Sequence, residues 1–251
     1  MHAAILIAIL AAAAQAQGFM REHEDALLDF RYGWPAVVEE EPALRAILVR
    51  EMEAAEAQAK AAAEEDREAR RESGSPFHGH SFAKVWRAAG STPRLLSLTA
   101  EHETFTGGAH GSFAFAAVLW DRAADRQLDA AILLDGPVLD RLTPRHCAAL
   151  NAQRSERRGE PVAGDGDDPF TSCPSLGSLP LAPTDADGDG RFDTIAVLIA
   201  PYEAGPWAEG SYVVELPLEA EDVADLPAVY RPAFEPAEAA SPEPAKTGER
   251  G

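Results

Sequence analysis

Alternating aspartates at residues 185–193 form the strongest local motif of this chain. The segment reads Asp-Ala-Asp-Gly-Asp-Gly-Arg-Phe-Asp, with carboxylates at positions 1, 3, 5 and 9 of a calcium-binding loop and glycine at position 6. Position 12 is Ala196 instead of a bidentate glutamate, and a strand pattern follows instead of a helix. We therefore expect a structural Ca²⁺ site of low affinity; the alternative is an acidic turn with solvated carboxylates. The expected ligands are Asp185, Asp187, Asp189, the main-chain carbonyl of Arg191, and Asp193.

Histidines and glutamates in the first half of the chain are a weaker candidate for chemistry. Imidazole and carboxylate groups on adjacent strands can hold zinc with an open position for water. Strand alternation, however, places His102 on the face opposite Glu101 and Glu103, and no His-Glu-x-x-His motif is present. A metal-dependent cell-wall hydrolase is thus one hypothesis, and exposed or capping histidines are the other. The residues concerned are His78, His80, Glu101, His102, Glu103 and His110.

Other catalytic signatures are absent from the sequence. It has no Gly-x-Ser-x-Gly motif, no glycine-rich phosphate loop before a helix, and no cysteine with a placed base. We assign no catalytic residue and favour a protein that is not an enzyme. The formal net charge of −20 disfavours binding to nucleic acid and favours cationic partners or metal ions.

The N-terminus predicts export. Residues 3–14 form an apolar, alanine-rich run that ends in Ala14-Gln15-Ala16, a small-x-small cleavage pattern, although no Lys or Arg precedes the run. We predict a signal peptide over residues 1–16 and a periplasmic or secreted protein; a buried N-terminal helix is the alternative. The run is shorter than the ~20 apolar residues that span a bilayer, so we expect no transmembrane span.

Two cysteines, Cys147 and Cys173, fit an exported protein. In an oxidising compartment an even pair usually forms a bridge. Closing a loop of this size stabilises a protein by about 3 kcal/mol in the chain-entropy model. We predict a disulfide, with two unrelated buried thiols as the alternative.

Hydrophobic periodicity predicts an α+β fold, in which an antiparallel sheet packs with one long N-terminal helix and a second, shorter helix. Leu44, Ile47, Leu48 and Met52 recur at helical spacing after Pro42. We expect one module over residues 17–234 and a disordered tail over 235–251, which is rich in Pro, Glu and Ala. The expected elements are a strand at 26–34, a helix at 42–72, a meander at 77–121, a helix at 137–153, loops at 154–183 and a hairpin at 194–218.

A glycine-rich turn joins two strand-like segments of the meander: Thr106-Gly107-Gly108-Ala109-His110-Gly111. Adjacent glycines permit positive φ, so the chain can reverse here or approach another group closely. A second segment downstream combines a strand with a Pro/Tyr turn and ends in a closing strand. Its characteristic residues are Pro201, Tyr202, Gly205, Pro206 and Gly210, followed by Leu216-Pro217.

These two segments resemble the extracytoplasmic domain-of-unknown-function family shared by the lysozyme-sensing anti-sigma factor RsiV and the peptidoglycan deacetylase PdaC. In the deacetylase this domain precedes the catalytic one. The resemblance covers residues 25–234 and implies a non-catalytic binding or sensing module of the cell envelope. Its implied ligand is a cationic protein such as lysozyme or a peptidoglycan-related molecule. A cell-wall hydrolase and a structural, calcium-stabilised envelope protein are the alternatives.

Overall fold

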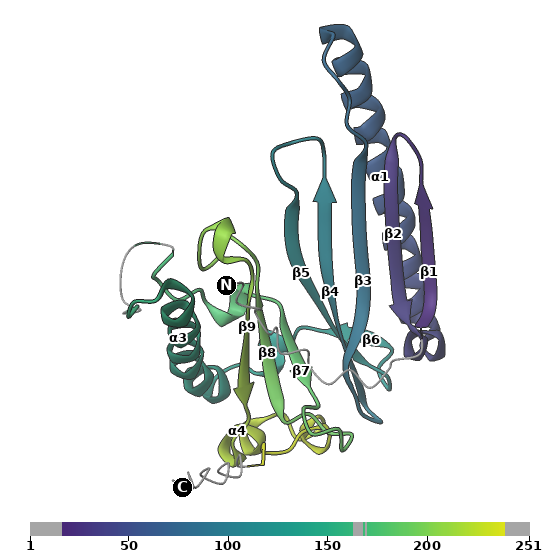
Figure 1. Cartoon of the computed structure of the whole chain (residues 1–251). Coiled ribbons are helices and arrows are strands. Elements are labelled where there is room, and N and C mark those ends of the chain that lie inside the picture. The colour runs from purple at the N-terminus through teal and green to yellow at the C-terminus, as the bar shows by residue number, and fades with distance from the viewer. Residues whose placement is uncertain (1–16, 163–167, 169, 239–251) are drawn as a thin grey trace, which may run out of the picture.

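The computed structural model describes residues 17–162, 168 and 170–238. The predicted signal peptide, residues 1–16, and residues 239–251 of the predicted tail lie outside the described residues. Two sheets dominate the molecule (Figure 1). Within the described ranges, no helix is long and apolar enough to cross a membrane.

The larger sheet has six strands in sequential order. All neighbours pair antiparallel except β2 and β3, which are parallel because helix α1 (Pro42–Ser73) connects them. The parallel pair departs from the antiparallel sheet that we predicted. The strands are β1 (Gln17–Glu24), β2 (Leu28–Pro35), β3 (His80–Ser91), β4 (Leu95–Phe105), β5 (Ser112–Asp121) and β6 (Arg126–Leu128).

Helix α1 covers one face of this sheet. Proline stands in its first turn, and Gly74, with φ of 69°, ends it within one residue of the predicted boundary. Leu44, Leu48 and Met52 of the predicted apolar stripe are buried in a cluster with aromatic residues of β2 and β3. The long helix therefore packs on its own sheet.

The smaller sheet contains β7 (Leu181–Thr184), β8 (Thr194–Ile199) and β9 (Tyr212–Pro217). The predicted hairpin is confirmed, since β8 pairs with β9 from Thr194↔Pro217 to Ile199↔Tyr212. One face of β8 packs on the larger sheet through Ala196 and Leu198, near Phe115 and Ala117. The opposite face packs against helix α3 (Pro137–Arg158).

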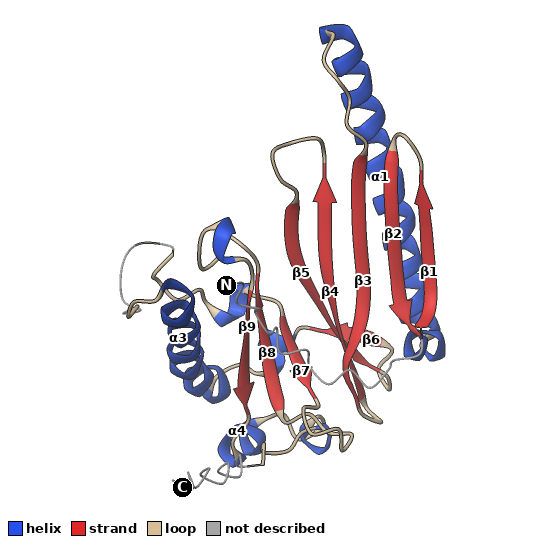
Figure 2. Ribbon diagram, viewed as in Figure 1, coloured by secondary structure: helices blue, strands red, loops and turns tan. Residues whose placement is uncertain are grey.

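The molecule therefore has four layers: α1, the six-stranded sheet, the three-stranded sheet and α3 (Figure 2). The predicted α+β class is correct. The remaining short helices are α2 (Ala130–Leu133), α4 (Ala220–Asp225) and the 3₁₀ turns η1 (Ala36–Glu40), η2 (Leu176–Ser178), η3 (Trp207–Glu209) and η4 (Arg231–Ala233).

Several boundaries differ from the prediction for physical reasons. Strand β1 is a polar edge strand, and β7 is short and contains Pro183, so neither shows a strand pattern. Helix α3 runs five residues beyond 153 because arginines, not apolar side chains, anchor its last turns. At the C-terminus, Glu235 and Ala237 donate main-chain hydrogen bonds to Phe192 and Leu218, so ordered chain continues past the predicted start of the tail.

Candidate functional site

The two segments that carry the family resemblance meet in space. The ring of His110, from the β4–β5 turn, stacks on Trp207 of η3 with centroids 4.5 Å apart and an interplanar angle of 21°. Tyr202 completes the group at 5.9 Å from Trp207 and 6.5 Å from His110. We call these three side chains the aromatic platform. Tyr202 is 53% exposed and His110 is also exposed, so the platform faces solvent.

Glycines and one hydrogen bond shape the β4–β5 turn. Of the two adjacent glycines only Gly107 has positive φ, at 81°. Gly111 allows close approach of the two strand ends, because a Cβ atom there would lie 2.6 Å from the Thr104 carbonyl. Nδ1 of His110 donates to the Gly111 carbonyl at 2.7 Å, which fixes the imidazole in the turn. His110 is therefore held by its own backbone in the orientation that stacks on Trp207.

Tyr202 has an unusual backbone conformation. Its φ is +73°, a left-handed region that side chains other than glycine occupy at a cost of about 1–3 kcal/mol. The Tyr202 amide donates to the Gly205 carbonyl at 2.9 Å, closing a tight turn that projects the phenol outward. Such strain persists only where the surroundings fix the chain, and it concentrates at functional sites.

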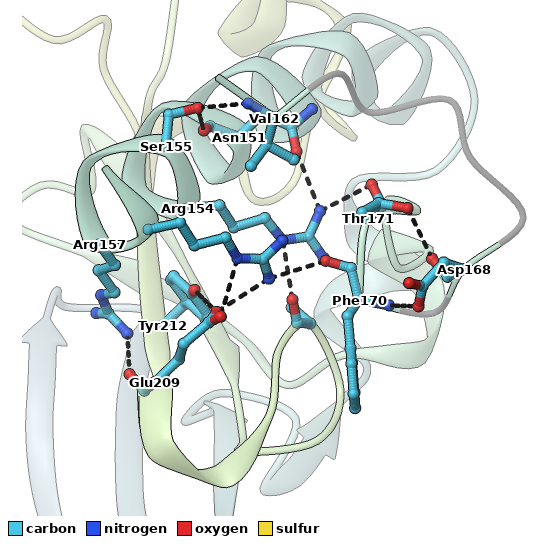
Figure 3. Close-up of polar contacts among 12 residues, drawn as sticks. Asn151, Arg154, Ser155, Arg157, Val162, Asp168, Phe170, Thr171, Glu209 and Tyr212 are labelled. Carbon is cyan, nitrogen blue, oxygen red and sulfur yellow. Dashed lines mark hydrogen bonds and ion pairs between the residues drawn. The ribbon is translucent and has the colours of Figure 1, made fainter. Parts of the chain in front are cut away.

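Arginines of α3 fix the loop between β8 and β9 (Figure 3). Arg158 donates two hydrogen bonds to the Glu209 carboxylate, at 2.9 and 3.0 Å, and the Tyr212 hydroxyl donates to the same carboxylate. Arg157 donates to the Glu209 and Ser211 carbonyls at 2.7 and 2.8 Å. Burial raises the pKa of Glu209, but hydrogen bonds from Arg158 and Tyr212 outweigh it and hold that pKa below its ordinary value.

Arg154 is fully buried and bonds to main-chain carbonyls from two separate segments. It donates to Ala204 in the β8–β9 loop at 2.9 Å, and to Thr171 and Ser172 at 3.1 and 2.9 Å. It also donates to the Asn151 side chain at 3.0 Å. Burial lowers the pKa of Arg154 because the charged form loses hydration. One buried cation thus joins α3 to both loops.

The predicted disulfide between Cys147 and Cys173 is present, with a Cα–Cα distance of 5.5 Å. It ties the segment that carries Thr171 and Ser172 to α3, about two helical turns before Arg154. The cysteines were found from their number and the export signal, whereas their role in holding the carbonyl partners of Arg154 follows only from the fold.

The aspartate loop brings three of its predicted ligands together. One carboxylate oxygen from each of Asp185, Asp187 and Asp189 lies within 4.8 Å of the others. Asp193 stands outside this group, is buried, and accepts from the Ala186 amide at 3.1 Å. Several loop amides also donate to these aspartates; Gly188, for example, bonds to Asp185 at 2.7 Å.

Glu235 is an acidic neighbour of this loop that sequence reasoning missed. Burial and nearby Asp189 raise the pKa of Glu235, and one of its carboxylate oxygens is buried without a hydrogen-bond partner. The other bonds to the side chain of Arg191 at 3.0 Å. Glu235 lies 42 residues beyond the loop's last aspartate and follows a parallel bridge between Phe192 and Phe234, so no local pattern could place it.

The histidines and glutamates of the hydrolase hypothesis are spread over different surroundings. His102 packs on Phe82 on the α1 face of the sheet, where burial lowers its pKa. His80 contacts Asp66 at 3.4 Å, and Glu101 pairs with Arg87 at 3.6 Å. In the part of the chain that the structure describes, only Asp185, Asp187 and Asp189 form a group of three residues spaced to hold a metal ion.

Comparisons with known proteins found one matching family model and similar solved structures. Residues 21–113 match the family model described as "Deacetylase PdaC". No curated protein matches this chain. The structure is similar to a DUF3298 family member from Bacteroides fragilis NCTC 9343, with a TM-score of 0.51, 17% identity, and coverage of 84% of this chain and 94% of that one.

A second solved structure has the same fold. A DUF3298 family protein from Pseudomonas aeruginosa PAO1 is similar with a TM-score of 0.54 at 16% identity, over 89% of this chain and 97% of that one. At these identities the likeness establishes the fold alone. The family model over residues 21–113 and the fold over most of the chain together confirm the resemblance to the domain family of unknown function that occurs N-terminal to deacetylase domains.

Proposed function

We propose that this protein is a non-catalytic binding or sensing module of the cell envelope, and that the aromatic platform is its ligand-binding surface. The convergence of both resemblance segments on His110, Tyr202 and Trp207 carries this proposal. Exposed aromatic rings on a fixed loop lose little conformational entropy on binding and provide large contact areas. The strained backbone of Tyr202 supports a functional reason for presenting the ring.

The ligand that these observations favour is a cationic protein. Aromatic faces attract ammonium and guanidinium groups, and exposed Glu203 lies in the same loop. The net charge of −20 attracts a basic partner over long range and accelerates encounter. Lysozyme is the cationic protein that the family resemblance implies. A peptidoglycan-related glycan could stack on the same rings, and it is the competing outcome of the test.

Calorimetric titration with hen egg-white lysozyme tests this function. Tyr202→Ala and Trp207→Ala should each weaken binding by at least about thirtyfold, as expected for central aromatic anchors. Ile132→Ala is the matched control, because this side chain is 73% exposed and lies in α2 outside the platform. Unchanged affinity in both platform variants would contradict the proposed site.

Salt dependence separates the two ligand classes. Association with a cationic protein should slow markedly between low and high salt, because the Debye length falls from ~30 Å at 0.01 M to ~10 Å at 0.1 M. Binding of an uncharged chitin oligosaccharide, used as the glycan probe, should not change with salt. Glycan binding without lysozyme binding would overturn the cationic partner and retain the platform.

We also propose that the aspartate loop binds Ca²⁺ in a structural role. The three close carboxylates support this, since like charges so near one another are relieved by a cation. Thermal unfolding in calcium and then in chelator tests the site: a higher melting temperature in calcium is expected, and identical curves would contradict it.

A periplasmic or secreted location completes the proposal. The Cys147–Cys173 disulfide supports it, because such bridges persist in oxidising compartments. Fractionation of cells that produce the full chain, with N-terminal sequencing of the product, tests both export and the predicted cleavage after residue 16. A cytoplasmic product with an intact N-terminus would contradict this location.

A further inference from the structure

A continuous path of bonds runs from the disulfide to the aromatic platform. Cys173 follows directly after Ser172, whose carbonyl accepts from Arg154. The same guanidinium holds the Ala204 carbonyl, and Ala204 lies inside the turn that Tyr202 and Gly205 close. The Cys147–Cys173 disulfide is thus connected to Tyr202 through Ser172, the Arg154 guanidinium and Ala204.

Arg154 is the central part of this path. Its guanidinium is buried and donates hydrogen bonds to the Asn151 side chain and to the carbonyls of Thr171, Ser172 and Ala204. A buried charge is costly unless its donors are satisfied. Moving the segment at 171–172 removes two of these acceptors at once, so the position of Arg154 and of the Ala204 turn depends on that segment.

The disulfide holds this segment in place and is accessible. Both cysteines are partly exposed, so we expect a dithiol in solution to reach the disulfide. We propose that the thiol–disulfide state of Cys147 and Cys173 controls the order of the platform, with Arg154 as the positioning residue that transmits the change. The oxidised protein presents an ordered platform; the reduced protein has a loosened β8–β9 loop and a weakened platform.

The redox step balances with a dithiol as reductant. One thiolate of the dithiol attacks a cysteine sulfur, breaks the Cys147–Cys173 bond and forms a mixed disulfide. The second thiol of the reductant then displaces this cysteine. The protein gains two electrons and two protons as two thiols, and the dithiol leaves as its own disulfide.

We call this transmission from the disulfide through Arg154 to the platform the relay. Hydrogen exchange measured by mass spectrometry on the full chain tests it without any ligand, so the outcome is independent of the proposed binding function. Reduction with dithiothreitol should raise exchange in residues 200–210 by about ten- to a hundredfold, because bonds to a charged group stabilise a site by that factor. Exchange in α1 and β4 should not change. The Cys147→Ser/Cys173→Ser variant should exchange fast at 200–210 with or without dithiothreitol.

The Arg154→Lys variant tests whether the disulfide acts on the platform through Arg154 or only stabilises the whole fold. Lysine keeps the charge but cannot bond to both loops in the guanidinium geometry, so exchange at 200–210 should already be fast in the oxidised variant, and reduction should add little. Independent, additive effects of the two changes would overturn the relay. Slow exchange at 200–210 in verified reduced protein, or an equal rise in every segment, would overturn it as well.

Discussion

The two connections of the small sheet are held in place in opposite ways. The β7–β8 connection, residues 185–193, organises itself: Asp185 accepts from the Gly188 amide at 2.7 Å and from the Asp189 amide at 3.1 Å. The β8–β9 connection, residues 200–211, is held from outside by three arginines that lie about 50 residues earlier in α3. The aspartates of the first loop accept hydrogen bonds from amides of the same loop, whereas the second loop depends on α3 for its position.

This difference implies different dependence on the rest of the molecule. A loop held by local side-chain-to-backbone hydrogen bonds should tolerate substitutions elsewhere in the molecule. Metal binding should change the stability of this loop without affecting the β8–β9 loop. A loop held by distant cations should respond to anything that moves α3 or the disulfide. The two regions can be separated by substitutions that act on one and spare the other.

The largest effect should follow from removing the buried cation. Arg154→Met leaves three carbonyls without their donor, and we expect a loss of about 3 kcal/mol in the free energy of unfolding, measured by urea titration. Arg157→Met is the matched control on the exposed side of α3 and should cost less than about 1 kcal/mol. Equal losses of unfolding free energy in the two variants would show that buried Arg154 contributes no more to stability than exposed Arg157.

A change in the aspartate loop should show itself only with calcium. At a Ca²⁺ concentration ten times the dissociation constant, binding stabilises the folded state by about 1.4 kcal/mol. Asp187→Asn/Asp189→Asn should lose this increment and, in chelator, should be at least as stable as the natural protein because carboxylate repulsion falls. Calorimetry in both conditions measures it. A variant that keeps the calcium increment would show that these side chains are not ligands.

A smaller effect should reveal the strain in the platform loop. Tyr202→Gly and Tyr202→Ala both remove the ring, but only glycine accepts a φ of +73° without steric cost. We expect the glycine variant to be more stable than the alanine variant by about 1 kcal/mol in thermal unfolding. Both variants should lose lysozyme binding. An alanine variant as stable as the glycine variant would argue against stored strain.

The smallest effect should be a dependence of stability on pH near α3. Burial lowers the pKa of His146, so the folded state resists its protonation while the unfolded chain takes up the proton near pH 6.5. This contribution is complete above pH 6.5 and is lost as pH falls toward the depressed pKa. Urea titrations between pH 7 and 5 should therefore show falling stability, and His146→Gln should flatten part of the slope. His102, whose pKa burial also lowers, should contribute in the same direction.

Local patterns in the sequence were sufficient for much of the fold. Periodicity located α1, the meander, the first part of α3 and the β8–β9 hairpin, because each has an apolar face of its own. Polar β1 and proline-containing β7 were not predicted as strands, because they form by pairing with neighbouring strands and have no strand pattern of their own. The parallel β2–β3 pair depends on which strands α1 brings together.

The candidate site was predictable only in parts. The glycine turn and the Pro/Tyr segment stood out by resemblance, yet nothing in the spacing of His110 and Trp207, 97 residues apart, indicates that their rings stack. The roles of Arg154, Arg158 and Glu209 are likewise long-range, and charged residues in a polar helix end resemble a solvated surface. Contacts of this kind become visible only when the two sheets and α3 are assembled.

Two-dimensional ¹H–¹⁵N spectroscopy of the tryptophan indoles tests the central claim most directly. The chain has four tryptophans; Trp34, Trp86 and Trp120 are buried on strands of the larger sheet in its apolar cluster with α1, and Trp207 belongs to the platform. Titration with hen egg-white lysozyme should shift the Trp207 indole signal and leave the other three in place. Binding that shifts none of the four, or that leaves Trp207 unchanged while a buried indole moves, would contradict the account.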